Sequence, residues 1–246
     1  MSTTTATPQA PATIHRPIVG RVESEESVAY FDSDQLVVFG GIGWAGYEEV
    51  LKVRGGRARP RLVYLDGDLL LMSPGHSHER DKDRFLLFVA ATARALRMRF
   101  RSSGSTMYRR RSKDGGVEPD QSFYFANAGR VAGKLEIDLD VDPPPDLAIE
   151  VVYSHSADAA VEVSQRLGIP EVWVCDERGL TFLVLGEDGS YEESATSRSF
   201  PLLPASEILG WVRHPDGVEF TDLEWLDALD SWMQETLLPR AANHTP

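Results

Sequence analysis

The stretch PPPDLAIEVV, residues 143–152, places Glu150 inside an apolar run that is typical of a buried strand. Burying an isolated carboxylate is costly, so such an acid is normally paired, protonated or bound to a metal. Strand alternation puts Asp146 and Glu150 on one face, but their Cα atoms are then about 13 Å apart. Two ligands of one Mg²⁺ each lie about 2.1 Å from the ion, so a partner from a neighbouring strand is easier to place. Asp120, which begins the strand-like run DQSFYF, is the best-placed candidate.

The residue types around these two acids favour a hard divalent cation. The chain has one cysteine, Cys175, and no Cys/His cluster, so it offers no zinc site. Carboxylate oxygens favour Mg²⁺ or Mn²⁺ instead. From spacing alone a structural alternative stays open, in which Glu150 forms an ion pair with an arginine and Asp120 only caps a turn.

Length and composition indicate a globular intracellular protein. The 246 residues, of which 42% are hydrophobic and 26% charged, suit one α/β domain with a tail and exclude a mainly disordered or fibrous chain. A lone cysteine predicts a reducing, cytoplasmic location. Because no apolar run is long enough to span a bilayer and the start has no signal-peptide pattern, we expect no membrane association.

Charge is unevenly distributed along the chain. The net charge of −13 argues against bulk attachment to nucleic acid. Residues 94–113, however, contain eight basic residues and no acid, and we call this segment the basic run. It predicts contact with a nucleic-acid backbone, or simply a solvated helix face. The residues expected to make the contact are Arg101, Arg109, Arg110, Arg111 and Lys113.

Periodicity and turn residues predict a mixed sheet with helices packed against it. A strand at 36–39 precedes a helix at 44–53, and two strands join in a hairpin through Asp66-Gly67-Asp68. A long amphipathic helix should then continue to about Phe100. The hairpin strands are expected at 62–65 and 69–72, further strands at 105–110, 121–125, 147–153, 171–175, 180–185 and 190–193, and further helices at 158–167, 205–212 and 222–238.

Several blocks of sequence resemble one known family. They occur in order between about residues 36 and 205, and the most specific are VEPD at 117–120, PPPDLAIEV at 143–151 and LGIPEVW at 167–173. They are similar to the Uma-type putative restriction endonuclease family. The resemblance implies the PD-(D/E)XK fold, an α/β fold with a mixed sheet flanked by helices, and a Mg²⁺-dependent phosphodiesterase site.

The resemblance also implies roles for individual residues. Asp120 matches the PD element and Glu150 the (D/E) element, so these two would hold the Mg²⁺ or Mn²⁺ ion. The lysine of the motif falls on Val152, and its alternative position in the following helix falls on Ala160. This loss is the main departure from the family, because a missing preorganised cation commonly costs about 10²-fold to 10³-fold in rate.

Other polar residues near the expected site allow two interpretations each. Glu79 is a candidate catalytic acid that binds metal or positions water, or an acid favoured by the helix dipole. Lys82, one turn later, is a substitute for the missing lysine or a solvated surface side chain. His76 and His78 are expected to be surface histidines. His155, just after the Glu150 strand, is a candidate for the cleft.

Three functions are compatible with these observations. The first is a Mg²⁺-dependent DNA endonuclease in which a metal-activated water attacks a phosphodiester. The second is a non-catalytic module that keeps the nuclease fold and binds nucleic acid or protein, and the third is a scaffold. A homo-oligomer is compatible with all three. The expected organisation is a flexible arm at 1–20, a nuclease-like domain at 21–205 and C-terminal helices at 206–246.

Overall fold

The computed structural model describes residues 34–153, 157–213 and 221–244. The predicted flexible arm at 1–20 and His155 lie outside the described residues. The strands are β1 Gln35–Phe39, β2 Arg61–Leu65, β3 Asp68–Ser73, β4 Arg101–Ser102, β5 Tyr108–Arg110, β6 Gly115–Val117, β7 Gln121–Tyr124, β8 Leu147–Val151, β9 Glu171–Asp176, β10 Gly179–Leu185 and β11 Tyr191–Ser194. The helices are α2 Gly43–Arg54, α3 His76–Ala95, η1 Arg111–Lys113, α4 Asp158–Leu167, α5 Ala205–Val212, α6 Asp222–Trp232, η2 Met233–Leu237 and α7 Leu238–Ala242.

The strands form two sheets rather than the single sheet that the sequence predicts. The smaller sheet has the order β1-β3-β2-β6-β5 and is antiparallel throughout. The larger sheet has the order β11-β10-β9-β8-β7-β4, and only its central pair β8 and β9 is parallel. The α/β class and the flanking helices are confirmed. The predicted hairpin β2–β3 and the meander β9–β10–β11 are confirmed as well.

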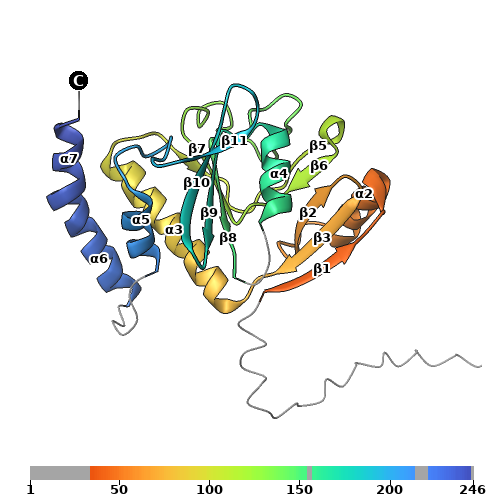
Figure 1. Ribbon diagram of the computed structural model, residues 1–246, viewed down its shortest axis with the longest axis horizontal. Coiled ribbons are helices and arrows are strands. Elements are labelled where there is room, and N and C mark those ends of the chain that lie inside the picture. Colours follow the sequence, from red (N-terminus) through yellow and green to blue (C-terminus); the bar gives the residue numbers. More distant parts are fainter. Residues whose placement is uncertain (1–33, 154–156, 214–220, 245–246) are drawn as a thin grey trace, which may run out of the picture.

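Helix α4 lies between the two sheets (Figure 1). It connects the parallel strands β8 and β9, as a crossover between parallel strands requires. Its side chains Ala160, Val163 and Leu167 pack with Val63 and Val117 of the smaller sheet. The two sheets therefore meet along this helix, and residues at the end of β8 face residues of β2.

The main hydrophobic core lies on the other face of the larger sheet. Helices α3 and α5 cover that face, and α6 packs on their outer side (Figure 1). The same core cluster contains alternate residues of β8, namely Leu147, Ile149 and Val151. The intervening residues of β8, Ala148 and Glu150, point to the α4 side, since successive strand residues face opposite sides. The predicted alternation in this strand is confirmed.

Helix α3 ends earlier than predicted. Its stripe of buried residues includes Phe85, Val89 and Thr92, as expected from their spacing. The helix stops at Ala95, where Leu96 forms the C-cap and Arg97 has a φ of 57°. Phe100 is therefore outside the helix, because the reversal at Arg97 directs the chain into β4.

Strand β6 was not predicted, because two of its three residues, Gly115 and Gly116, are glycines, which are depleted in strands. A Cβ atom at Gly116 would lie 2.4 Å from the Tyr47 hydroxyl oxygen. Glycine is thus required where α2 packs closely on the smaller sheet. The strand predicted at 105–110 is correspondingly shorter and begins at Tyr108.

The C-terminal helices pack on the body of the protein. Helix α5 contacts α3 and β10, and buried side chains of α6 and η2 extend the main core. The proposed division at residue 205 stays a prediction. No helix among the described residues combines the length and the apolar character needed to cross a membrane.

Candidate active site between the two sheets

Asp120 lies at the point where the chain leaves the smaller sheet and enters the larger one. It follows β6 by way of Glu118-Pro119 and is 1% exposed. Its Oδ2 atom accepts a hydrogen bond of 2.6 Å from the backbone N–H of Val151. Because Gln121 pairs with Ile149 in the antiparallel ladder, Asp120 is placed beside Glu150. The two acids that the sequence singled out are thus brought to the same end of β7 and β8.

Arg61 of β2 forms a buried ion pair with Asp120, between its Nη1 atom and the Oδ1 of the acid. The Arg61 side chain is 5% exposed. Its Nη2 atom also donates a hydrogen bond of 2.6 Å to Nε2 of His78. Burial lowers the pKa of Arg61, while the charges of Glu150 and Glu79 oppose that shift. The guanidinium remains charged, because arginine keeps its proton in proteins.

His78 is a buried member of the site, so its interpretation as a surface residue was wrong. Its ring is fully buried, and Nε2 lies 2.8 Å from Oδ1 of Asp120. Because guanidinium groups only donate, Nε2 accepts from Arg61 and Nδ1 carries the proton, which it donates to Oδ2 of Asp34 at 3.1 Å. Burial lowers the pKa of His78, the hydrogen bond to Asp34 opposes that shift, and the charge of Arg61 reinforces it.

Glu150 is buried at the end of β8 and lines a small cavity of about 30 Å³. Burial raises the pKa of Glu150 to about 8, and the charge of Arg61 limits the shift. Its Oε1 atom has no hydrogen-bond partner among the described residues. Arg61, Val152 and Ala160 line the same cavity. The two positions at which the family motif predicts a lysine therefore face the acid, and an arginine from β2 supplies the nearby positive charge.

Glu118, which the sequence did not single out as a site residue, forms the wall of the site on the β6 side. Its carboxylate accepts two hydrogen bonds of 2.5 Å from the Nη atoms of Arg54 and one of 2.9 Å from the N–H of Leu62. It lines the same cavity as Glu150. Because all three contacts are to donors in the protein, we assign it a structural role.

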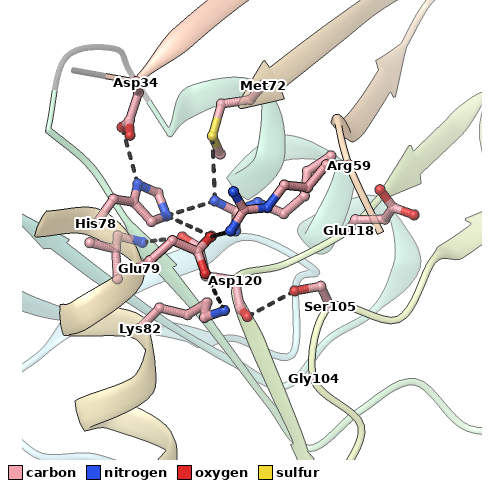
Figure 2. Close-up of polar contacts among 12 residues, drawn as sticks. Asp34, Arg59, Met72, His78, Glu79, Lys82, Gly104, Ser105, Glu118 and Asp120 are labelled. Atoms are coloured by element: carbon pink, nitrogen blue, oxygen red, sulfur yellow. Dashed lines mark hydrogen bonds and ion pairs between the residues drawn. The ribbon is translucent and has the colours of Figure 1, made fainter. Parts of the chain in front are cut away.

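Glu79 and Lys82 lie at the rim of the site, at the start of α3 (Figure 2). Glu79 accepts a hydrogen bond of 2.7 Å from Lys82 and forms an ion pair of 3.0 Å with Arg59. Partial burial raises the pKa of Glu79, but the hydrogen bond and charge of Lys82, with the charge of Arg59, hold it below its ordinary value. The proposed roles of Glu79 in catalysis and of Lys82 as the missing cation stay predictions.

The basic run does not form one surface. Arg94 pairs with Asp230, Arg109 with Glu48 and Arg110 with Asp140, while Arg101 donates to the carbonyl of Lys134. A segment without acids is therefore partly neutralised by acids from elsewhere in the sequence.

Arg111 and Lys113 are exposed in the turn between β5 and β6. That turn lies at the far end of β2, because Asp114 bonds to the N–H of Asp66. At about 3.3 Å per residue, this end is about 13 Å along the strand from Arg61. Contact of these residues with nucleic acid stays a prediction.

Two further acids, Asp146 and Asp81, form hydrogen bonds within the protein, and the cysteine is buried, so we assign all three a structural role. Asp146 accepts hydrogen bonds from the backbone N–H groups of Phe125 and Asn127 and from the Asn127 side chain. Cys175 is fully buried in β9. Asp81 is also fully buried and accepts hydrogen bonds from Tyr153 and Arg213.

The chain was compared with known proteins. The family model described as Uma2, putative restriction endonuclease, matches residues 46–216. The chain is also similar to a crystal structure described as a putative nuclease belonging to DUF820 from Anabaena variabilis, with 15% sequence identity and a TM-score of 0.46, over 74% of this chain and 96% of that one. No curated protein matches the sequence. Because the family model covers well over half of the 246 residues, the chain belongs to the Uma2 family, which is described as putative restriction endonuclease.

Proposed function

We propose that this chain hydrolyses phosphodiester bonds of DNA with the help of Mg²⁺ or Mn²⁺ at Asp120 and Glu150. The observation that carries the proposal is the hydrogen bond from Val151 to Asp120, which fixes Asp120 beside the Glu150 end of β8. Membership of the family supports the reaction class. Burial of both acids next to a cation supports a site that performs chemistry rather than a chance surface pair.

The donor atoms of the two acids suit a hard divalent cation. Mg²⁺ commonly binds to one or two carboxylates and completes its coordination with water and substrate phosphates. No cluster of three His, Cys, Asp or Glu side chains with metal-binding geometry occurs among the described residues. The buried Oε1 of Glu150 lacks a partner there, as expected of an atom that awaits a ligand. A bound ion would lower the pKa of a water and neutralise charge on the phosphate.

The protein's own groups would prepare the site. Arg61 holds a fixed positive charge against Asp120 and beside Glu150, where a negatively charged phosphate would enter. His78 fixes the guanidinium of Arg61, and Asp34 fixes the ring of His78. Arg61 would thus provide part of the charge stabilisation that the family lysine provides. Glu79, which is held ionised by Lys82 and Arg59, would orient an attacking water.

Cleavage assays with matched variants test this proposal. Supercoiled and linear DNA would be incubated with the purified chain in Mg²⁺, in Mn²⁺ and in EDTA. We expect metal-dependent cleavage that falls by about 10²-fold or more in Asp120→Asn and in Glu150→Gln. Glu192→Gln, which removes an exposed acid from the edge strand β11, should cleave as the wild type does. Cleavage that is unchanged in both acid variants, or absent under every condition, would refute the proposal.

The alternative is a non-catalytic module that keeps the fold and binds a partner. The observation that favours it is that Val152 and Ala160, not lysine, line the cavity beside Glu150. The substitution Ala160→Lys separates the two functions. If the remaining site is competent, the added lysine should raise metal-dependent cleavage. If the wild type binds DNA without cleaving it and Ala160→Lys adds no activity, the binding module is the correct assignment.

A further inference from the structure

The loop that joins α2 to β2 is the most basic short segment near the site. Residues 54–61, which we call the arginine loop, read RGGRARPR and contain four arginines and no acid. Arg57 and Arg59 are exposed, whereas the side chains of Arg54 and Arg61 are only 12% and 5% exposed. The loop therefore has two anchored arginines at its ends and two accessible ones between them.

Three arginines of this loop contact acids of the site. Arg61 pairs with Asp120, Arg54 binds Glu118 through two hydrogen bonds, and Arg59 forms an ion pair with Glu79. Figure 2 shows Arg59, Glu79, Lys82 and Glu118 around Asp120. Because Arg61 pairs with Asp120 itself and Arg54 with Glu118, two residues before it, the loop is fixed at the rim of the proposed catalytic pair.

A groove of about 400 Å³ adjoins the loop on the α2 side of the smaller sheet. Arg54, Arg57 and Arg59 line it, together with the apolar side chains of Val53 and Leu71. Glu49 is the acid in its lining, and Lys52 donates a hydrogen bond of 2.6 Å to that acid. The groove thus combines arginine and apolar side chains in its lining. It lies on the opposite face of the smaller sheet from the cavity beside Glu150, because Leu62 and Leu71 alternate with Arg61 and Met72, which line that cavity.

This combination suits a nucleic-acid strand better than a free anion. Guanidinium groups bind phosphate oxygens through paired, charge-assisted hydrogen bonds, and apolar surface suits sugars and base faces. Around Asp120, Arg54, Arg59, Arg61 and Lys82 form ion pairs with the carboxylates of Glu118, Glu79, Asp120 and Asp83. Although the whole chain carries a net charge of −13, residues 54–61 themselves contain four arginines and no acid.

We propose that Arg57 and Arg59 bind backbone phosphates of a nucleic-acid strand and position that strand beside the Asp120–Glu150 pair. The inference rests on the proposed function, because it names the surface through which the substrate reaches the same site. Arg57 and Arg59, rather than Arg111 and Lys113, are then the main phosphate contacts, since the turn that holds Arg111 and Lys113 lies at the far end of β2.

Two double variants with equal loss of charge provide the test. Arg57→Gln/Arg59→Gln removes the accessible pair of the arginine loop, and Arg111→Gln/Lys113→Gln removes two exposed charges from the distant turn. Binding of a fluorescein-labelled oligonucleotide would be measured by anisotropy in EDTA over a series of KCl concentrations. Single-stranded DNA, duplex DNA and RNA of one sequence would identify the preferred strand.

The loop variant should bind about tenfold or more weakly than the wild type, with a salt slope that is smaller by about 1.4 to 1.8, as expected for two lost phosphate contacts. The turn variant should bind as the wild type does. Because Arg57 also donates to the carbonyl groups of Val53 and Arg54, and Arg59 pairs with Glu79, the loop variant should melt slightly below the wild type but remain folded at the assay temperature. Arg57→Lys/Arg59→Lys, which keeps the charges, should recover part of the affinity. Equal weakening in the loop and turn variants, unchanged binding in the loop variant, or no binding by the wild type at low salt would overturn the inference.

The binding assay also separates this inference from the proposed function. A chain that binds DNA through Arg57 and Arg59 but never cleaves it would refute the proposed hydrolysis and leave the binding surface in place. A chain that cleaves DNA with undiminished affinity in the loop variant would refute the binding surface alone.

Discussion

Arg61 and Asp120 form a buried ion pair that connects the two sheets. Arg61 lies on β2 of the smaller sheet, and Asp120 directly precedes β7 of the larger sheet. The pair has little access to water, so each charge depends on the other. Removing one member of a buried pair usually costs about 3–5 kcal/mol, because the remaining charge is left without compensation.

We therefore expect Arg61→Met to lower the free energy of unfolding by about 3–5 kcal/mol. The double variant Arg61→Met/Asp120→Asn should recover part of that loss, since it leaves no unpaired charge. Urea denaturation of the two single variants and the double variant measures the coupling. If the single-variant effects simply add, the two side chains are not coupled in the folded protein.

The pKa of Glu150 leads to a prediction about stability and pH in the presence of EDTA. The folded state keeps its proton up to about pH 8, whereas the ordinary value is 4.5. Between these two pH values the folded state binds more protons than the unfolded state. The contribution of Glu150 to stability is therefore greatest at low pH and falls as pH rises, by up to about 1.4 kcal/mol per pH unit.

Glu150→Gln should remove that component, because the amide does not titrate. The difference in unfolding free energy between wild type and variant, measured by urea denaturation from pH 5 to pH 9, should change in favour of the variant up to about pH 8 and then level off. A constant difference across this range would show that burial of the carboxyl group has no energetic effect on folding.

Gly116 lies where a side chain would collide with Tyr47. A Cβ atom there would lie 2.4 Å from the Tyr47 hydroxyl oxygen and 3.0 Å from Cζ of the ring. Gly116→Ala should lower the free energy of unfolding by about 1–3 kcal/mol. Tyr47→Phe/Gly116→Ala removes the nearest colliding atom and should lose less than the sum of the single variants. Additive losses in thermal or urea unfolding would contradict this contact.

Cys175 should be unreactive in the folded protein. It is fully buried, and burial raises the pKa of its thiol to about 12, so almost no thiolate exists at pH 8. A thiol reagent such as dithiobis(nitrobenzoate) should label the native chain very slowly and label one thiol per chain in urea. Rapid labelling of the native chain would place this thiol at an accessible position.

The sequence predicted elements whose signals are local. Helix α4 was predicted at its observed bounds, because Gly168 and Pro170 end an amphipathic segment, and strand β8 was recognisable from its apolar run. Strand β6 was missed, because its glycines are explained by residues distant in sequence, Val163 beside Gly115 and Tyr47 beside Gly116.

Only part of the site was predicted, because some of its residues come together only in the folded chain. Asp120 and Glu150 were recognised within motif blocks, but Arg61 and His78 join them only through the packing of β2 and α3, which no local pattern reveals. The run RGGRARPR was a usable signal, since four arginines in eight residues without an acid are unusual in an acidic chain. The basic run was more conspicuous, yet three of its arginines, Arg94, Arg109 and Arg110, are paired with acids.

Helix α4 both joins the two sheets and lines the cavity beside Glu150. Val163 and Leu167 pack between the sheets, Ala159 lines the cavity, and Ala160 does both. A residue introduced at position 160 therefore alters the packing between the sheets as well as the chemistry of the cavity, so the helix links the stability of the fold to the properties of the site.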